Sequence, residues 1–160
     1  TNAANPFPIG GSHDVGGVSS FNWQSSWLGN YYAPTNSPVI NKGSVTANTL
    51  GLYHFTTQID QTKEAASVVD MGYHYVAVDG NGRPLDYDSD GLADYLEDAN
   101  GNGIFDDGDW GDWASADADG DGVVDWVEIA QGRNPNSPTS PGATPDGGDV
   151  LKLRVYTPLR

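Results

Sequence analysis

The side chains best suited to chemistry gather in residues 86–128, where oxygen-bearing groups recur at short, regular intervals. This stretch holds 15 of the 22 acidic residues of the chain and no lysine or arginine. So many like charges cannot share a compact segment without counter-ions. The stretch is therefore either a solvated acidic linker or a segment folded around cations. Carboxylate, amide and carbonyl oxygens are the ligands that Ca²⁺ prefers, about six to eight at a time.

The first 12-residue window of this stretch, 86–97, reads DYDSDGLADYLE and is called the first loop below. A common calcium loop places its ligands at positions 1, 3, 5, 7, 9 and 12 and a glycine at position 6, where the chain turns sharply. The first loop matches every one of these positions, with Gly91 at the sixth. Its predicted ligands are Asp86, Asp88, Asp90, the Leu92 carbonyl, Asp94 and Glu97.

A second complete match, 117–128, reads DADGDGVVDWVE and is called the last loop. Gly122 stands at its sixth position, and apolar residues follow at positions 7 and 8 and at 10 and 11. An acidic tract without structure has no reason to repeat this arrangement, which favours the folded alternative. The predicted ligands are Asp117, Asp119, Asp121, the Val123 carbonyl, Asp125 and Glu128.

Between them lies a weaker match, 98–109, reading DANGNGIFDDGD and called the middle loop. Its predicted ligands are Asp98, Asn100, Asn102, the Ile104 carbonyl, Asp106 and Asp109. The twelfth position carries aspartate, whose shorter arm makes bidentate binding harder than with glutamate, and Asp107 or Asp112 could substitute for it. The three loops together predict about three Ca²⁺ ions and no other cofactor.

The rest of the chain predicts a mainly β protein, because glycine and proline are frequent and the apolar runs are short. We expect an extended N-terminal arm at 1–20, a β domain at 21–85, and the calcium-binding segment at 86–132, irregular with short helices and ending at Gly132. A Pro/Ser/Gly linker at 133–149 and a C-terminal strand at 150–160 follow. In that strand, residues 151, 153 and 155 are apolar and alternate with polar or amphipathic ones.

Inside the β domain, the segments 52–55 and 72–75 both contain histidine between aromatic residues and lie twenty residues apart. This spacing suits successive coils of a β-solenoid, in which equivalent positions stack. A small sandwich layer is the competing prediction for the same residues.

Other candidate groups are few. His54 and His74 could bind a metal with Asp70, although imidazoles at the edge of an aromatic core are more common. Glu64 is interpreted as a solvated carboxylate, and no residue set suggests catalysis, so we expect no enzyme. Four aromatic residues could instead stack on sugars or fill the β core: Trp23, Trp27, Tyr31 and Tyr32.

The overall charge limits the possible partners. A formal net charge of -15 and a pI near 4.1 argue against nucleic acid and anionic membranes as partners. The sequence contains no apolar run of about 20 residues, so membrane insertion is not expected. Cysteine is absent, which excludes disulfides.

Residues 86–138 resemble thrombospondin type 3 calcium repeats, through the run DxDxDGxxDxxE, then NxNG, then DxDGDGxxDxxE and the ending WVEIAQGRNPNSP. That resemblance implies structural calcium in a chain with little apolar core. The insert 110–116 departs from it. Residues 34–76, with APTNSPVINKGS and VVDMGYHYV, are similar to the terminal coils of secreted bacterial β-helix proteins. The whole chain resembles protomers of extracellular calcium-binding fibrils from environmental microbes.

Together these patterns lead to one functional hypothesis and one alternative. We expect an extracellular or cell-surface structural protein, stabilised by calcium, that forms a homo-oligomer or filament by exchange of its terminal strand. The alternative is a carbohydrate-binding or adhesin module of a larger secreted protein. Glycans are possible partners in either case, bound at the aromatic residues or O-linked to the linker.

Overall fold

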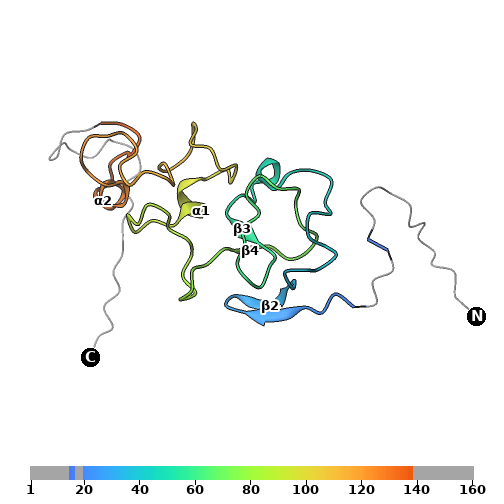
Figure 1. The fold of residues 1–160 in the computed structure, drawn as a ribbon. Helices are drawn as coiled ribbons and strands as arrows, with labels where there is room; N and C mark the ends of the chain where they lie inside the picture. Colours follow the sequence, from blue (N-terminus) through green and yellow to red (C-terminus); the bar gives the residue numbers. More distant parts are fainter. Residues whose placement is uncertain (1–14, 17–19, 139–160) are drawn as a thin grey trace, which may run out of the picture. The chain divides into compact units, whose positions relative to one another are not determined.

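The computed structural model describes residues 15–16 and 20–138 (Figure 1). These residues fall into two compact units. Unit 1 contains the residues up to Leu85 together with Asn100–Ile104, and unit 2 contains Asp86–Ala99 and the residues from Phe105 onward. Most of the predicted arm and linker, and the whole predicted C-terminal strand, lie outside the described residues.

Unit 1 is built from short strands. β1 (Gln24–Ser26) pairs antiparallel with β2 (Gly29–Tyr32), and β3 (Phe55–Thr56) pairs antiparallel with β4 (Tyr75–Val76). A 3-10 helix, η1 (Ala47–Leu50), is the helical element of this unit within the described residues. The prediction of a mainly non-helical protein with short strands is thereby confirmed.

The solenoid version of that prediction is not seen. The described residues form no closed solenoid, and the two histidine-containing segments meet in antiparallel pairing rather than stacking in parallel. Phe55 pairs with Val76 and Thr56 with Tyr75, so equivalent positions of the two segments are not partners. The twenty residues between the two segments thus form a long connection between antiparallel strands, not one coil of a solenoid.

Aromatic packing joins the two small sheets of unit 1. Tyr32 is fully buried, and its ring stacks on that of Tyr75 with centroids 4.2 Å apart. The Tyr75 hydroxyl accepts a hydrogen bond from the Tyr31 backbone N–H at 3.3 Å. A side chain at Gly29 would collide with the Tyr75 ring, so the hairpin can approach β4 because this residue has no Cβ.

Two buried carboxylates complete the core of unit 1, and the chain itself satisfies both. Asp70 accepts hydrogen bonds from the Asn41 N–H at 2.7 Å and from the Thr57 hydroxyl at 2.6 Å. Glu64 accepts one from the Asp70 N–H at 3.2 Å and lies 3.0 Å from His74 Nε2. The interpretation of Glu64 as a solvated carboxylate is therefore wrong, because this residue is 4 % exposed and pairs with the half-buried His74.

Unit 2 is largely irregular, with two short helices, α1 (Asp94–Glu97) and α2 (Asp125–Gln131). α2 ends at Gly132, which adopts the left-handed conformation with φ 70° and donates its N–H back to the last turn, as the sequence predicted. Within the residues that the structure describes, no helix has the length and apolar character needed to cross a membrane.

Candidate calcium-binding loops

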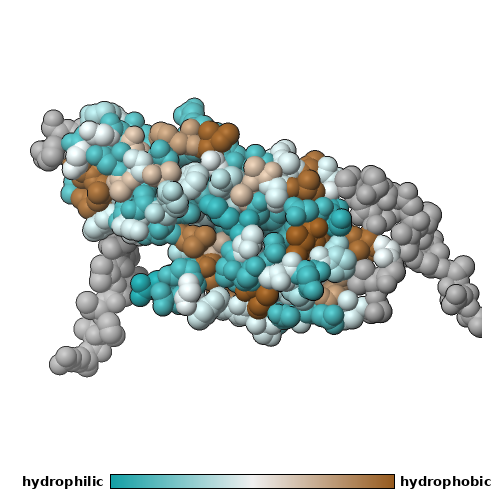
Figure 2. Space-filling model, viewed as in Figure 1, coloured by the Kyte–Doolittle hydropathy of each residue, from teal (hydrophilic) through white to brown (hydrophobic). Residues whose placement is uncertain are grey.

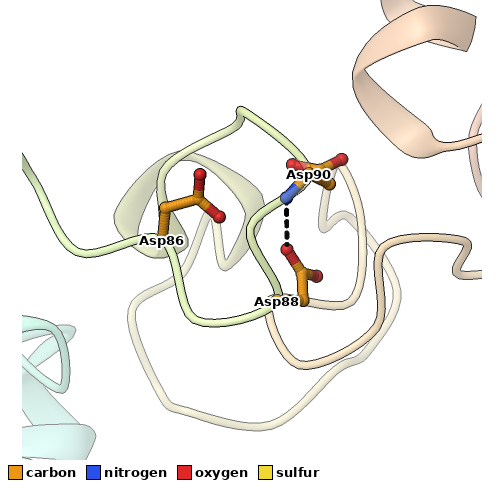
Figure 3. Close-up of side chains that lie close together, drawn as sticks. All are labelled: Asp86, Asp88 and Asp90. Atoms are coloured by element: carbon orange, nitrogen blue, oxygen red, sulfur yellow. Dashed lines mark hydrogen bonds between the residues drawn. The ribbon is translucent and has the colours of Figure 1, made fainter.

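The first loop is shaped by hydrogen bonds from its own backbone to its acidic side chains. Asp88 Oδ1 accepts from the Asp90 N–H at 3.1 Å, and Asp90 Oδ1 accepts from the Leu92 N–H at 2.7 Å. Asp86 Oδ2 accepts from the N–H of Gly91 at 3.1 Å. These bonds use one oxygen of each carboxylate to bend the chain, and the three side chains lie close together on one turn (Figure 3).

The last loop repeats this arrangement position by position. Asp119 Oδ1 accepts from the Asp121 N–H at 2.9 Å, and Asp121 Oδ1 from the Val123 N–H at 2.9 Å. Asp117 Oδ2 accepts from the Gly122 N–H at 2.8 Å. Two segments that are separate in sequence therefore adopt one local fold, which indicates a shared structural requirement.

Left-handed backbone conformations complete the turns. The sixth residue has a positive φ in all three loops: 103° at Gly91, 82° at Gly103 and 93° at Gly122. The fourth position is also left-handed in each, and in the first loop it is Ser89, with φ 65°. In the outer loops the backbone conformation alone favours glycine at the sixth position, whereas a Cβ at Gly103 of the middle loop would also collide with the Tyr53 ring.

The short helices place the ninth and twelfth residues of the outer loops on one face. Asp94 and Glu97 lie in α1, and Asp125 and Glu128 lie in α2, three residues apart in each case. The ninth-position carboxylates close their loops, because Asp94 Oδ1 accepts from the second-position N–H at 2.7 Å and Asp125 Oδ1 does so at 2.8 Å. The twelfth-position glutamates, Glu97 and Glu128, are buried.

Glu97 and Glu128 are the most telling side chains of the two loops. Both are 0 % exposed, and none of their four carboxylate oxygens has a hydrogen-bond partner in the described part of the chain. An Arg133 guanidinium nitrogen lies 3.5 Å from Glu128 Oε1, forming a buried ion pair. Buried carboxylates are normally hydrogen-bonded or paired, so Glu97 in particular occupies a place that suits a bound cation.

The electrostatics of the loops agree with this geometry. Burial, aided by the negative charges of Asp88 and Asp90, raises the pKa of Glu97 to about 9. Burial also raises the pKa of Glu128 to about 7, and those of Asp88 and Asp125 to about 6. Each outer loop therefore contains buried acidic groups whose ionised form is disfavoured, a condition that a divalent cation relieves.

In each outer loop, three aspartates lie close enough together to hold one metal ion. Asp86, Asp88 and Asp90 each offer one oxygen within 4.8 Å of the others, and Asp117, Asp119 and Asp121 do the same. These six residues are predicted ligands of the first and last loops. The structure thus brings the first three acidic positions of each outer loop together, and these clusters could hold a metal ion.

The middle loop is divided between the two units. Asn100–Ile104 belongs to unit 1, where the Tyr53 N–H donates to the Gly101 carbonyl at 3.0 Å. In unit 2, Asp109 accepts from the Ala99 N–H at 3.0 Å and from the Asp106 N–H at 2.8 Å. Asp109, predicted at the twelfth position, thus accepts from the second-position N–H, a bond that the ninth residue accepts in the outer loops. Its role as a ligand stays a prediction.

Sequence reasoning missed two features of this region. One is Arg133, which lies beyond the last loop but pairs with Glu128. The other is a contact between the outer loops, in which the Trp126 N–H donates to Asp90 Oδ2 at 3.2 Å. A single basic residue five positions after the loop glutamate could have indicated the Arg133–Glu128 pair. No sequence signal indicates the contact between Trp126 and Asp90.

The other candidate groups are placed as follows. His74 pairs with Glu64 and Asp70 is bonded to backbone and hydroxyl donors, so the structure gives no support to a histidine–Asp70 metal site. Of the four aromatic sugar candidates, Tyr32 is buried in the core, whereas Trp23, Trp27 and Tyr31 are exposed. Figure 2 shows hydrophobic residues as separate patches on a largely hydrophilic face.

Comparisons of the chain with protein-family models, with curated proteins and with solved structures find no match. The geometry of the loops is therefore the basis for the functional inference that follows.

The raised pKa values predict how stability depends on pH when calcium is removed. Between about pH 4.5 and about pH 9 the folded chain keeps a proton on Glu97 that the unfolded chain releases, so stability falls as the pH rises. In EDTA, the melting temperature of unit 2, followed by tryptophan fluorescence, should decrease steadily across this range. Saturating calcium should remove or reverse this trend, because calcium binds the ionised carboxylates.

The matched variant for this measurement is Glu97→Gln, which cannot titrate. In EDTA its melting temperature should change less with pH than that of the wild-type chain. A wild-type melting temperature in EDTA that is constant or rises with pH would contradict the assignment of Glu97 as a buried, uncompensated acid.

Proposed function

We propose that this chain is a calcium-stabilised structural protein, in which the outer loops and the middle loop bind Ca²⁺ to keep residues 86–132 folded. The observation that carries the proposal is the burial of Glu97, whose two carboxylate oxygens have no hydrogen-bond or ion-pair partner among the described residues, whereas Glu128 is also buried but lies beside Arg133. Leaving an ionised carboxylate in this state costs several kcal/mol or more. A cation enclosed by each loop would offset that cost and neutralise the surrounding aspartates.

The ligand chemistry favours calcium over other metals. Every predicted ligand is an oxygen, and each outer loop supplies a glutamate long enough to bind with both oxygens. Zinc and copper prefer nitrogen and sulfur, and the loops contain no histidine or cysteine. Magnesium needs a tight octahedron and keeps several waters, which suits a flexible ring of carboxylates less well.

The affinity expected of such loops supports an extracellular location. Extracellular calcium modules commonly bind with Kd values of about 10⁻⁴–10⁻³ M. Sites this weak would stay empty at the calcium concentration of the cytosol. A hundredfold excess of calcium over Kd stabilises the folded form by about 2.7 kcal/mol per site. With about three sites, calcium would then supply much of the stability of a segment that has little apolar core.

Assembly is the proposed purpose of this stiffened segment. The sequence from Leu151 to Tyr156 alternates apolar and polar residues as a half-buried strand does, and such a strand must pair with a sheet edge. Lys152, Arg154 and Arg160 are three of the seven basic residues in the chain. They would be attracted to an acidic segment of a neighbouring copy. We therefore infer a homo-oligomer or filament joined by strand exchange.

The exposed aromatic residues of unit 1 support the alternative function. Trp23, Trp27 and Tyr31 are 39 %, 55 % and 60 % exposed and come from the β1–β2 hairpin and the residue just before it. Aromatic rings that remain open to solvent can stack on sugar rings. The chain could accordingly be a carbohydrate-binding or adhesin module in which calcium has the same structural role.

Calcium removal should loosen one part of the chain and spare the other. In EDTA, limited proteolysis should cut within residues 86–132 at least tenfold faster than in calcium, because each filled site adds about 2.7 kcal/mol. Residues 21–79 should change less, since Asp70 and Glu64 are satisfied by the chain itself. The double variant Glu97→Gln, Glu128→Gln should be cut rapidly even in calcium.

The control for this experiment is Asp60→Asn, which alters an exposed acid of unit 1 outside the loops. Its cleavage pattern should follow that of the wild-type chain in both conditions. Equal cleavage of residues 86–132 with calcium and with EDTA would show that calcium does not hold this segment.

Strand exchange predicts that assembly depends on the end of the chain. Electron micrographs of the full chain in calcium should show filaments or sheets, and a chain ending at Pro145 should remain monomeric with its loops still binding calcium. Assembly of the shortened chain would contradict strand exchange. A full chain that stays monomeric and is retained by polysaccharide in affinity electrophoresis would favour the carbohydrate-binding alternative.

A further inference from the structure

Two buried carboxylates from different calcium loops meet beside Gly111. A Cβ atom at Gly111 would collide with Asp125 Oδ2 and would lie 3.1 Å from Glu97 Oε1, so both oxygens border the same small space. Glu97 belongs to the first loop and Asp125 to the last loop. Both side chains are 0 % exposed, and neither oxygen accepts a well-formed hydrogen bond within the described chain, although the Asp112 backbone N–H acts on the Asp125 carboxylate and partly offsets the rise in its pKa that burial causes.

Backbone contacts of unit 2 hold this junction in place. The Trp110 N–H donates to the Glu97 carbonyl at 2.9 Å, which positions the residue preceding Gly111 against α1. The Trp126 N–H donates to Asp90 Oδ2 at 3.2 Å and joins the start of α2 to the first loop. Asp125 Oδ1 accepts from the Ala118 N–H at 2.8 Å, and Oδ2 is the oxygen that borders the space beside Gly111.

Among the described residues, no ion pair of a basic side chain with Glu97 or Asp125 is found. Residues 86–128 contain no lysine or arginine, and Arg133 lies against Glu128 in the last loop. Two carboxylates that are buried together repel each other unless a proton or a cation lies between them. A cation at this junction would gain two oxygen ligands and would neutralise the two carboxylates.

We propose that Glu97 and Asp125 together bind a further divalent cation, a Ca²⁺ shared by the first and last loops. This ion is additional to the ion that each loop encloses. Oxygens that coordinate one Ca²⁺ lie about 2.3–2.6 Å from it, a spacing that these two side chains reach with a small movement of their flexible ends. Glu97 would bridge the shared ion and the ion of the first loop, and water would complete the coordination.

A shared ion makes the two loops interdependent. Calcium in the first loop would orient Glu97, and calcium in the last loop would orient Asp125, so each would favour binding at the junction. Because such coupling is reciprocal, filling one loop raises the affinity of the other. Gly111 has a specific role in this arrangement, since any side chain at this position would occupy the space of the ion.

This inference rests on the proposed calcium-binding function, and counting ions separates the two. Native mass spectrometry of the full chain at saturating calcium should find one ion fewer in Gly111→Ala than in the wild-type chain. The control Gly80→Ala introduces a methyl group where a Cβ meets no atom within 4 Å, and it should bind as many ions as the wild type. An equal count in Gly111→Ala and wild type would overturn the shared site.

A second variant decides the question if Gly111→Ala fails to fold. Asp125→Asn keeps an oxygen that can accept from the Ala118 N–H but removes the charge facing Glu97. Because Asp125 is also a predicted ligand of the last loop, the specific readout is the first loop, which should bind calcium about fivefold or more weakly in a titration. If Asp125→Asn binds as many ions as the wild-type chain, with unchanged affinity, the shared site is overturned. If the wild-type chain itself binds no calcium, the proposed function is overturned.

Discussion

The burial of acidic side chains without enough donors is the constraint on which unit 2 depends. Glu97 and Glu128 lie inside their loops with no exposed surface, and burial raises the pKa of both. Unit 1 solves the same problem differently, because Asp70 and Glu64 are buried beside hydroxyl, amide and imidazole groups. One chain thus contains buried acids that hydrogen bonds within the chain satisfy, and two buried glutamates whose oxygens accept no hydrogen bond from the described residues.

The irregular backbone of unit 2 follows from this constraint. In the outer loops, an oxygen of each early aspartate accepts a backbone N–H and bends the chain, and the clustered carboxylates could hold a metal ion. A segment of this kind needs little apolar core. Calcium would then replace hydrophobic burial as the main source of stability, and stability would vary with the concentration of the ion.

The sequence predicted the acidic positions that the structure brings together in the outer loops, namely Asp86, Asp88 and Asp90 in the first loop and Asp117, Asp119 and Asp121 in the last loop. Acidic residues at alternate positions with glycine at the sixth were sufficient to predict the loops, because each bond in them spans a few residues. Arg133 and Gly111 were not predicted as part of the site, since their roles arise from contacts between segments. Unit 1 was predicted as short strands in a β-solenoid or a sandwich layer, and its described residues form no closed solenoid. Its antiparallel pairing at Phe55 and Thr56 depends on long-range packing that periodicity does not encode.

The most direct test is a crystal structure grown in calcium, with anomalous diffraction used to locate the ions. We expect anomalous peaks enclosed by Asp86, Asp88, Asp90 and Glu97, and equivalent peaks in the last loop, at about 2.3–2.6 Å from the carboxylate oxygens. Loops without such peaks, with these acids turned toward solvent, would contradict the account.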